Sequence, residues 1–176
     1  MKSPATRIIE IISNIVIIAV AVVVGIAFYS AYFSKNKAPQ IVRPTVGSVM
    51  SVPGEDFSAA GNTLIIALQE GCHYCSESVP FYQRIINGPA NGVHLLALLP
   101  EDNRPQYIHD LHLNIGDIKR VKFSQYRIGG TPTLILVDHD GKIKNVWMGK
   151  LSPSIEQEVL KTLAAACSEC TVGDKK

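Results

Sequence analysis

The sequence lacks several patterns that would place it in common functional classes. It has no basic stripe interleaved with aromatic residues, and its formal net charge is only +2. Both observations argue against a nucleic-acid partner. It also has no internal repeat and no low-complexity tract. We therefore expect one globular domain of ordinary size, about 115–140 residues, in the part of the chain that follows residue 34.

Charged side chains are missing from Ile11 to Ser34. A helix needs about 20 apolar residues to cross a bilayer, and the apolar core of a cleavable signal peptide is only roughly 7–15 residues long. The run is apolar on all sides rather than along one stripe. We therefore predict an uncleaved signal anchor that crosses a cell membrane once. The alternative is a buried helix of a soluble core.

Cysteine is scarce, with four residues that form the pairs Cys72/Cys75 and Cys167/Cys170. Neither pair is followed by histidine, which excludes covalent haem attachment. Gln69 stands where a peroxidatic Thr-x-x-Cys needs threonine, which argues against a peroxidase. A zinc site made from both pairs needs four converging thiolates. Because the first pair lies at the start of a predicted helix, we predict no metal and no cofactor.

The pair Cys72/Cys75 lies between an aliphatic run, Thr63–Leu68, and a helical pattern that continues to about Asn87. A strand therefore delivers Cys72 to a helix N-terminus, where unpaired N–H groups and the helix dipole stabilise a thiolate. Such a position can lower the pKa of a cysteine from about 8.5 to roughly 3.5–7.5. The pattern indicates a redox-active dithiol.

The remaining pattern alternates strands and helices. We predict strands over 63–68, 93–99, 133–137 and 143–148, helices over about 72–87, 104–111 and from Pro153 onward, and a turn at 138–141. The range 113–128 has no clear period. This order favours an α/β fold with a mixed sheet and helices on both faces. The expected organisation is an anchor over 1–34, a stem and entry over 35–62 with a short edge strand near 41–46, a domain over 63–170 and a tail over 171–176.

Two prolines stand at unusual places. Pro80 falls inside the first helical pattern, where proline costs about 3 kcal/mol and kinks the helix. Pro132, within Gly129-Gly130-Thr131-Pro132-Thr133, opens a buried strand although it cannot donate to a strand ladder. A cis peptide bond is one special role that such a proline can have.

The chain resembles the thioredoxin superfamily over about residues 60–167. Three features carry this resemblance: the strand–CxxC–helix junction, Pro80, and the stretch Gly129-Gly130-Thr131-Pro132-Thr133. The stretch YRIGGTPTLILVDHDGKI is most similar to the membrane-tethered TlpA/ResA-like branch, whose members act outside the cytoplasm as thiol–disulfide oxidoreductases. The resemblance implies a thioredoxin fold with Cys72 as the attacking thiol and Cys75 as the resolving one. It also implies a cis-Pro132 beside the dithiol and a backbone at Thr131 that pairs with an extended substrate segment.

The implied partners are protein thiols or disulfides, together with a membrane-bound or soluble redox donor. Exchange proceeds through a mixed disulfide. The resemblance also implies that His73 and Tyr74 tune the site: His73 stabilises the thiolate, and Tyr74 shields the sulfur or contacts substrate. The alternative for His73 is a merely exposed side chain.

Basic residues flank the apolar run on both sides, so charge does not decide its orientation. Disulfides are made and exchanged outside the cytoplasm. We therefore expect the dithiol domain on the outer, periplasmic side of the cell membrane.

The chain departs from the family pattern at several positions. Gly71 stands where many thioredoxins have tryptophan, Ile66 replaces the buried acid of cytoplasmic thioredoxins, and Ser78 stands where ResA-type proteins have an acid. Glu70 and Glu77 lie near Cys75 in the sequence. They either accept the proton of Cys75 or are ordinary solvated carboxylates. The direction of electron flow is therefore left open.

Cys167 and Cys170 form a second pair near the end of the last predicted helix. Our prediction for it is a small local disulfide. The alternatives are no special role, an electron relay to Cys72, or metal binding.

Two other functional classes also fit the motif. One is a copper-handling module, because soft thiolates suit Cu(I). The other is a redox-silent docking domain that has kept the fold.

Overall fold

The computed structural model describes residues 4–35, 43–59, 61–88 and 92–170. The chain forms two compact units, Met1–Gln40 and Ile41–Lys176. The first contains helix α1 (Pro4–Lys35), whose described apolar side chains are exposed. Over the described residues, no helix combines the length and the apolarity that crossing a membrane requires. The tail expected over 171–176 lies outside the described residues.

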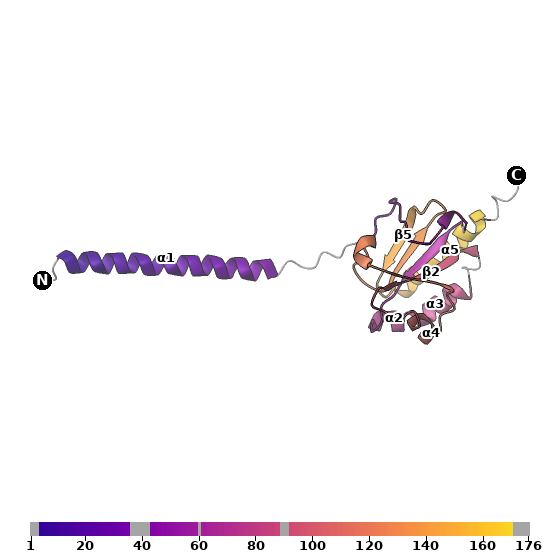
Figure 1. Cartoon of the computed structure of the whole chain (residues 1–176), viewed down its shortest axis with the longest axis horizontal. Coiled ribbons are helices and arrows are strands. Elements are labelled where there is room, and N and C mark those ends of the chain that lie inside the picture. Colours follow the sequence, from indigo (N-terminus) through magenta and orange to yellow (C-terminus); the bar gives the residue numbers. More distant parts are fainter. Residues whose placement is uncertain (1–3, 36–42, 60, 89–91, 171–176) are drawn as a thin grey trace. The chain divides into compact units, whose positions relative to one another are not determined.

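A five-stranded mixed sheet organises the second unit (Figure 1). Its strands stand in the order β3-β2-β1-β4-β5. Neighbours β1, β2 and β3 are parallel, whereas β4 is antiparallel to both β1 and β5. The bounds are β1 Thr63–Ala67, β2 His94–Pro100, β3 Asp117–Val121, β4 Thr133–Val137 and β5 Ile143–Met148. Four of these strands match the sequence prediction to within about two residues.

The fifth strand, β3, lies in the range for which the sequence predicted no element. It forms one edge of the sheet, and of its five residues only Val121 is buried. Lys119 and Arg120 place charged side chains in the middle of the strand. An edge strand of this kind carries no aliphatic run and no clean alternation, which is why its period was not visible.

All the described α-helices of the second unit pack on one face of the sheet. They are α2 (His73–Glu77), α3 (Val79–Ile86), α4 (Tyr107–Asp110) and α5 (Pro153–Cys170), and they share one hydrophobic core with alternate residues of the strands. The other face is covered by Met50, Val52 and Phe57 of the entry segment and by residues next to the short 3₁₀ helix η3 (Phe123–Tyr126). Helices do flank the sheet, as predicted, but those on the second face are the short 3₁₀ helices η1 (Phe57–Ala59) and η3, together with coil, rather than α-helices.

The entry segment is held against β5 by backbone pairing. The N–H of Gly47 donates to the carbonyl of Ile143 (2.8 Å), and the N–H of Met50 donates to that of Gly141 (2.8 Å). Val49 forms an isolated antiparallel bridge with Lys142. The edge strand expected near 41–46 is not seen over 43–46, and 41–42 lie outside the described residues. Pairing starts later, where the chain reaches β5.

The first helical pattern is two helices rather than one kinked helix. The break is at Ser78, whose N–H donates to the carbonyls of Tyr74 (3.1 Å) and Cys75 (3.2 Å). The Ser78 hydroxyl also donates to the Tyr74 carbonyl (2.8 Å). Pro80 lies in the first turn of α3, where its missing N–H has no partner to lose. The predicted interruption is real, but it lies two residues before Pro80.

Candidate active site

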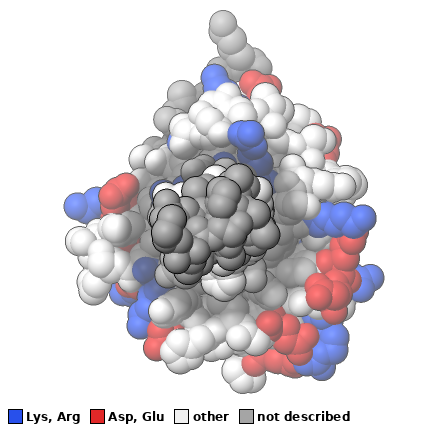
Figure 2. Space-filling view, turned by 90° about the vertical axis from the view of Figure 1, so that its left-hand side faces the viewer, with Lys and Arg blue, Asp and Glu red and all other residues white. Residues whose placement is uncertain are grey.

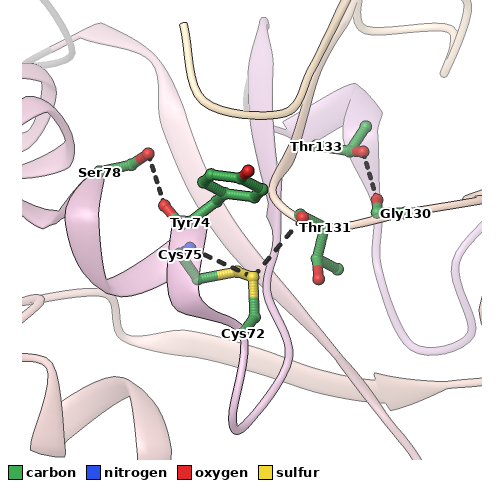
Figure 3. The surroundings of a disulfide bond; sticks show 7 residues. All are labelled: Cys72, Tyr74, Cys75, Ser78, Gly130, Thr131 and Thr133. Atoms are coloured by element: carbon green, nitrogen blue, oxygen red, sulfur yellow. Dashed lines mark hydrogen bonds between the residues drawn. A yellow bond between two sulfur atoms is a disulfide. The ribbon is translucent and has the colours of Figure 1, made fainter.

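Cys72 lies at the N-cap of α2, directly after the loop that follows β1 (Figure 3). Its N–H donates to the carbonyl of Gln69 (3.2 Å), which closes this loop. The loop turns at Gly71, whose φ of +77° lies in the left-handed region that glycine adopts without steric cost. The Sγ atom of Cys72 accepts the N–H of Cys75 (3.1 Å). Because α2 has only five residues, this direct N–H contact is a better physical reason for thiolate stabilisation than a long-helix dipole.

Cys72 and Cys75 form a disulfide, with 5.3 Å between their Cα atoms. The two sulfurs are in unequal surroundings. Cys75 is fully buried in the core beneath α2, whereas Cys72 is half-buried. A partner can therefore reach the first sulfur, while the second is reached only from within the protein.

The loop before β4 lies next to Cys72, on the side of its sulfur away from α2 (Figure 3). The carbonyl oxygen of Thr131 lies 3.5 Å from Cys72 Sγ (Figure 3). The Thr131–Pro132 peptide bond is cis, as the sequence predicted. Two bonds hold this loop: the hydroxyl of Thr133 donates to the Gly130 carbonyl (2.7 Å), and the N–H of Gly149 donates to the Pro132 carbonyl (2.7 Å). The predicted site residues are thus brought together from two distant parts of the chain.

Both residues between the cysteines point toward solvent. The side chain of His73 is 78% exposed, and its Nε2 lies 3.3 Å from Oε1 of Glu77, one helical turn later. Tyr74 is 55% exposed, with its ring centre 5.7 Å from that of His73. Within the described residues, the imidazole faces Glu77, whereas Cys72 Sγ accepts the N–H of Cys75 and lies near the Thr131 carbonyl oxygen.

Glu70 and Glu77, the two carboxylates near the dithiol, are both engaged in ion pairs. Arg104 donates to Oε1 of Glu70 through Nε (3.2 Å) and Nη2 (2.5 Å), and these bonds hold the pKa of Glu70 below its usual value. Lys150 donates to Oε2 of Glu77 (3.0 Å) and lowers the pKa of Glu77. A carboxylate with a lowered pKa is a weaker base, so neither group is well suited to accept the Cys75 proton.

Three residues near the site were not found from the sequence: Arg104, Lys150 and Tyr107. Arg104 comes from the loop after β2 and Lys150 from the connection between β5 and α5. Tyr107 opens α4, and burial raises the pKa of its hydroxyl, which lies close to Ser76. None of the three has a fixed spacing from the cysteines, so only the fold reveals their position.

Figure 2 shows basic (blue) and acidic (red) side chains interleaved on the face that it displays.

No family model and no curated protein matches the sequence. Solved structures do match. The thioredoxin domain of a thiol-disulfide oxidoreductase from Bacteroides vulgatus is 18% identical, with a TM-score of 0.52 over 68% of this chain and 98% of that one. A putative thiol:disulfide interchange protein DsbE from Chlorobium tepidum is 16% identical, with a TM-score of 0.52 over 73% and 99%. A thiol:disulfide interchange protein from Bacteroides sp. is 21% identical, with a TM-score of 0.51 over 72% and 90%.

The chain has the thioredoxin fold. The superposed lengths cover nearly all of the first two neighbours, so the likeness extends over almost the whole of those chains. Within this thioredoxin fold, the pair Cys72/Cys75 lies at the start of α2, the helix that follows β1, and the loop with the cis-proline lies beside it.

The second cysteine pair lies at the far end of α5 from this thioredoxin dithiol site. Cys167 is half-buried, and its sulfur packs directly over Gly92. The side chain of Cys170 lies outside the described residues. The predicted local disulfide between them therefore stays a prediction.

Proposed function

We propose that this protein is a membrane-tethered thiol–disulfide oxidoreductase that exchanges disulfides with protein substrates outside the cytoplasm. The observation that carries the catalytic part is the Cys72–Cys75 disulfide, with one sulfur half-exposed beside Thr131 and the other buried. This asymmetry separates the attacking thiol from the resolving thiol.

The proposed cycle has two exchange steps. The thiolate of Cys72 attacks a partner disulfide, an S–S bond forms to one partner sulfur, and the other partner sulfur leaves as a thiolate. The Cys75 thiol then loses its proton to water and attacks Cys72, which releases the second partner thiolate. Two electrons pass to the partner, and the protein ends with the Cys72–Cys75 disulfide. The reverse sequence oxidises a partner dithiol.

The tether is proposed from the sequence. The run from Ile11 to Ser34 has no charged side chain, and its described apolar residues, such as Val23 and Ile26, do not pack into a protein core. Apolar side chains without a protein partner favour a lipid environment. The outward location follows from chemistry, since disulfide exchange with secreted proteins takes place outside the cytoplasm.

Activity is tested with the full chain in a mild detergent. We expect it to reduce insulin with dithiothreitol as electron donor, or to reoxidise a reduced unfolded protein, and we expect Cys72→Ser to abolish both activities. If wild type and Cys72→Ser are equal in both assays, the redox-silent docking hypothesis is correct instead. The reduction potential of the pair then gives the direction: near −270 mV indicates a reductant and near −120 mV an oxidant.

Location needs a separate test. In intact bacterial spheroplasts, added protease should digest the unit that starts near residue 41 and leave a cytosolic marker protein whole. Protection of that unit until the membrane is lysed would contradict the outward orientation. Release of the full chain into the soluble fraction would contradict the tether.

A further inference from the structure

The carboxylate of Glu77 binds two basic side chains from different elements. Its Oε1 lies 3.3 Å from Nε2 of His73, within α2, and its Oε2 accepts a hydrogen bond from Nζ of Lys150 (3.0 Å). Each oxygen therefore has its own partner. Glu77 is about one-third exposed, less than either partner, so the carboxylate is the fixed centre of the group.

The position of Lys150 is itself fixed by the active-site loop. The preceding residue, Gly149, donates its N–H to the carbonyl of Pro132 (2.7 Å). Lys150 thus comes from a segment that is bonded to the loop beside Cys72. The ion pair with Glu77 joins this segment to α2 across the dithiol site.

The imidazole of His73 consequently lies on the Glu77 side of α2. Its neighbours are the Glu77 carboxylate and the ring of Tyr74, whereas the Cys72 sulfur contacts the Cys75 N–H and lies near the Thr131 carbonyl. An imidazole nitrogen forms one strong hydrogen bond at a time. A carboxylate beside Nε2 therefore removes that nitrogen from the reach of the thiolate, and it keeps the ring on the Glu77 side of α2.

We infer that Glu77 is a positioning residue that holds His73 away from Cys72 and so limits how far the imidazole stabilises the Cys72 thiolate. This inference rests on the proposed function, and it names a residue that shifts the equilibrium between the dithiol and the disulfide forms of Cys72/Cys75. Without the Glu77 charge, the ring is free to turn toward the sulfur. A more stable thiolate favours the dithiol over the disulfide, which makes the pair more oxidising.

The electrostatic surroundings agree with this arrangement. The pKa of Glu77 is lowered, first by the hydrogen bond from Lys150 and to a smaller extent by the charges of Lys150 and His73. Glu77 is thus ionised at neutral pH, so the group that faces His73 is a charged carboxylate. Pairs at exposed sites are weak, so we expect effects of about two- to five-fold in an equilibrium constant.

The test is a double-mutant cycle in the full chain: wild type, Glu77→Gln, His73→Ala, and the double variant. The ionisation of Cys72 is followed by thiolate absorbance near 240 nm against pH in the reduced proteins. The equilibrium with glutathione gives the redox constant. We expect Glu77→Gln to lower the apparent pKa of Cys72 and to shift the glutathione equilibrium about two- to five-fold toward the dithiol. In the His73→Ala background, the same change should have no effect.

Two outcomes overturn the inference. If Glu77→Gln shifts both quantities equally with and without His73, Glu77 acts directly on the sulfur through its charge. If Glu77→Gln shifts neither quantity, Glu77 has no part in the redox balance. Glu158→Gln, on the exposed surface of α5, removes the same charge as a control and should change nothing. The thiolate measurement uses no partner protein, so its result is independent of whether insulin is reduced.

Discussion

The carbonyl oxygen of Thr131 lies 3.5 Å from the Sγ of Cys72, although the two residues are 59 positions apart in the chain. The sulfur is within reach of this oxygen because the loop before β4 comes close to the start of α2. A reduced Cys72 can donate its S–H to that carbonyl. The loop therefore belongs to the site, and its supports can be tested one by one.

The first prediction concerns the hydroxyl of Thr133, which is fully buried and donates to the Gly130 carbonyl. Thr133→Val keeps the shape but leaves that carbonyl without its donor, so we expect a loss of about 1 kcal/mol of unfolding free energy. If the loop at Thr131 is held less firmly, its backbone pairs less well with an extended protein substrate. We therefore expect exchange with protein disulfides to slow more than exchange with glutathione. Denaturant unfolding and the two exchange rates measure this. Thr162→Val, which removes an exposed helix hydroxyl bond, is the matched control, and equal losses from both variants would argue against a role for the loop.

The second prediction uses the unequal burial of the two cysteines. Cys75→Ser should accumulate a covalent mixed disulfide with a protein substrate, because Cys72 still attacks but nothing resolves the product. Cys72→Ser should accumulate none, since Cys75 is fully buried. Non-reducing gel electrophoresis separates the two results. Trapping by both variants would show that Cys75 is accessible to partners.

The third prediction concerns acid stability. Arg104 lowers the pKa of Glu70 below its ordinary value of 4.5. As the pH falls through about that value, the unfolded chain takes up a proton before the folded chain does, so this contribution to stability is lost toward lower pH. Arg104→Gln should therefore flatten the fall of the melting temperature below pH 4.5 relative to wild type, while the two proteins differ most near pH 6. Parallel curves for the two proteins would show that the pair is not linked to folding.

The fourth prediction concerns Pro80. In a helix interior, replacing proline by alanine would be worth about 3 kcal/mol. Because Pro80 lies in the first turn of α3 after the break at Ser78, we expect Pro80→Ala to change the unfolding free energy by less than about 1 kcal/mol. Urea unfolding measures this change. A gain near the larger value would mean that α2 and α3 form a strained single helix.

The fifth prediction concerns Gly141, which has a φ of +72° and whose added Cβ would lie 2.6 Å from the Met50 carbonyl oxygen. Gly141→Ala should cost about 1–3 kcal/mol from strained backbone, with a further cost from that close contact. Gly47 has a φ of +88° with open space around it, so Gly47→Ala is the matched control for backbone strain. The difference between the two melting temperatures isolates the close contacts with the entry segment, at the Met50 carbonyl and the Phe57 ring. Equal melting temperatures would mean that the entry segment moves aside at no cost in stability.

The sequence predicted the parts of the fold that carry a strong local period. The aliphatic runs that became β1 and β4 lie in the middle of the sheet and are buried on both faces, which is why they were clear. Strand β3 was missed because an edge strand with charged residues has no such run. The cysteine pair was found because it stands where a strand pattern meets a helix pattern, and Pro132 because a proline at the start of a buried strand cannot donate to the strand ladder. Arg104 and Lys150 could not be found, since ion pairs between distant loops leave no spacing in the chain.

The cover of the second sheet face determines where the folded domain begins. Met50, Val52 and Phe57 fill the face that no described α-helix covers, yet they precede Thr63, where the sequence analysis placed the domain boundary. An expression fragment that begins at Thr63 would leave Ile65, Ile135 and Val137 facing water. The shortest fragment worth purifying therefore starts before the buried Pro44, and a chain cut between Phe57 and Thr63, which has lost all three covering residues, should aggregate even though its dithiol is intact.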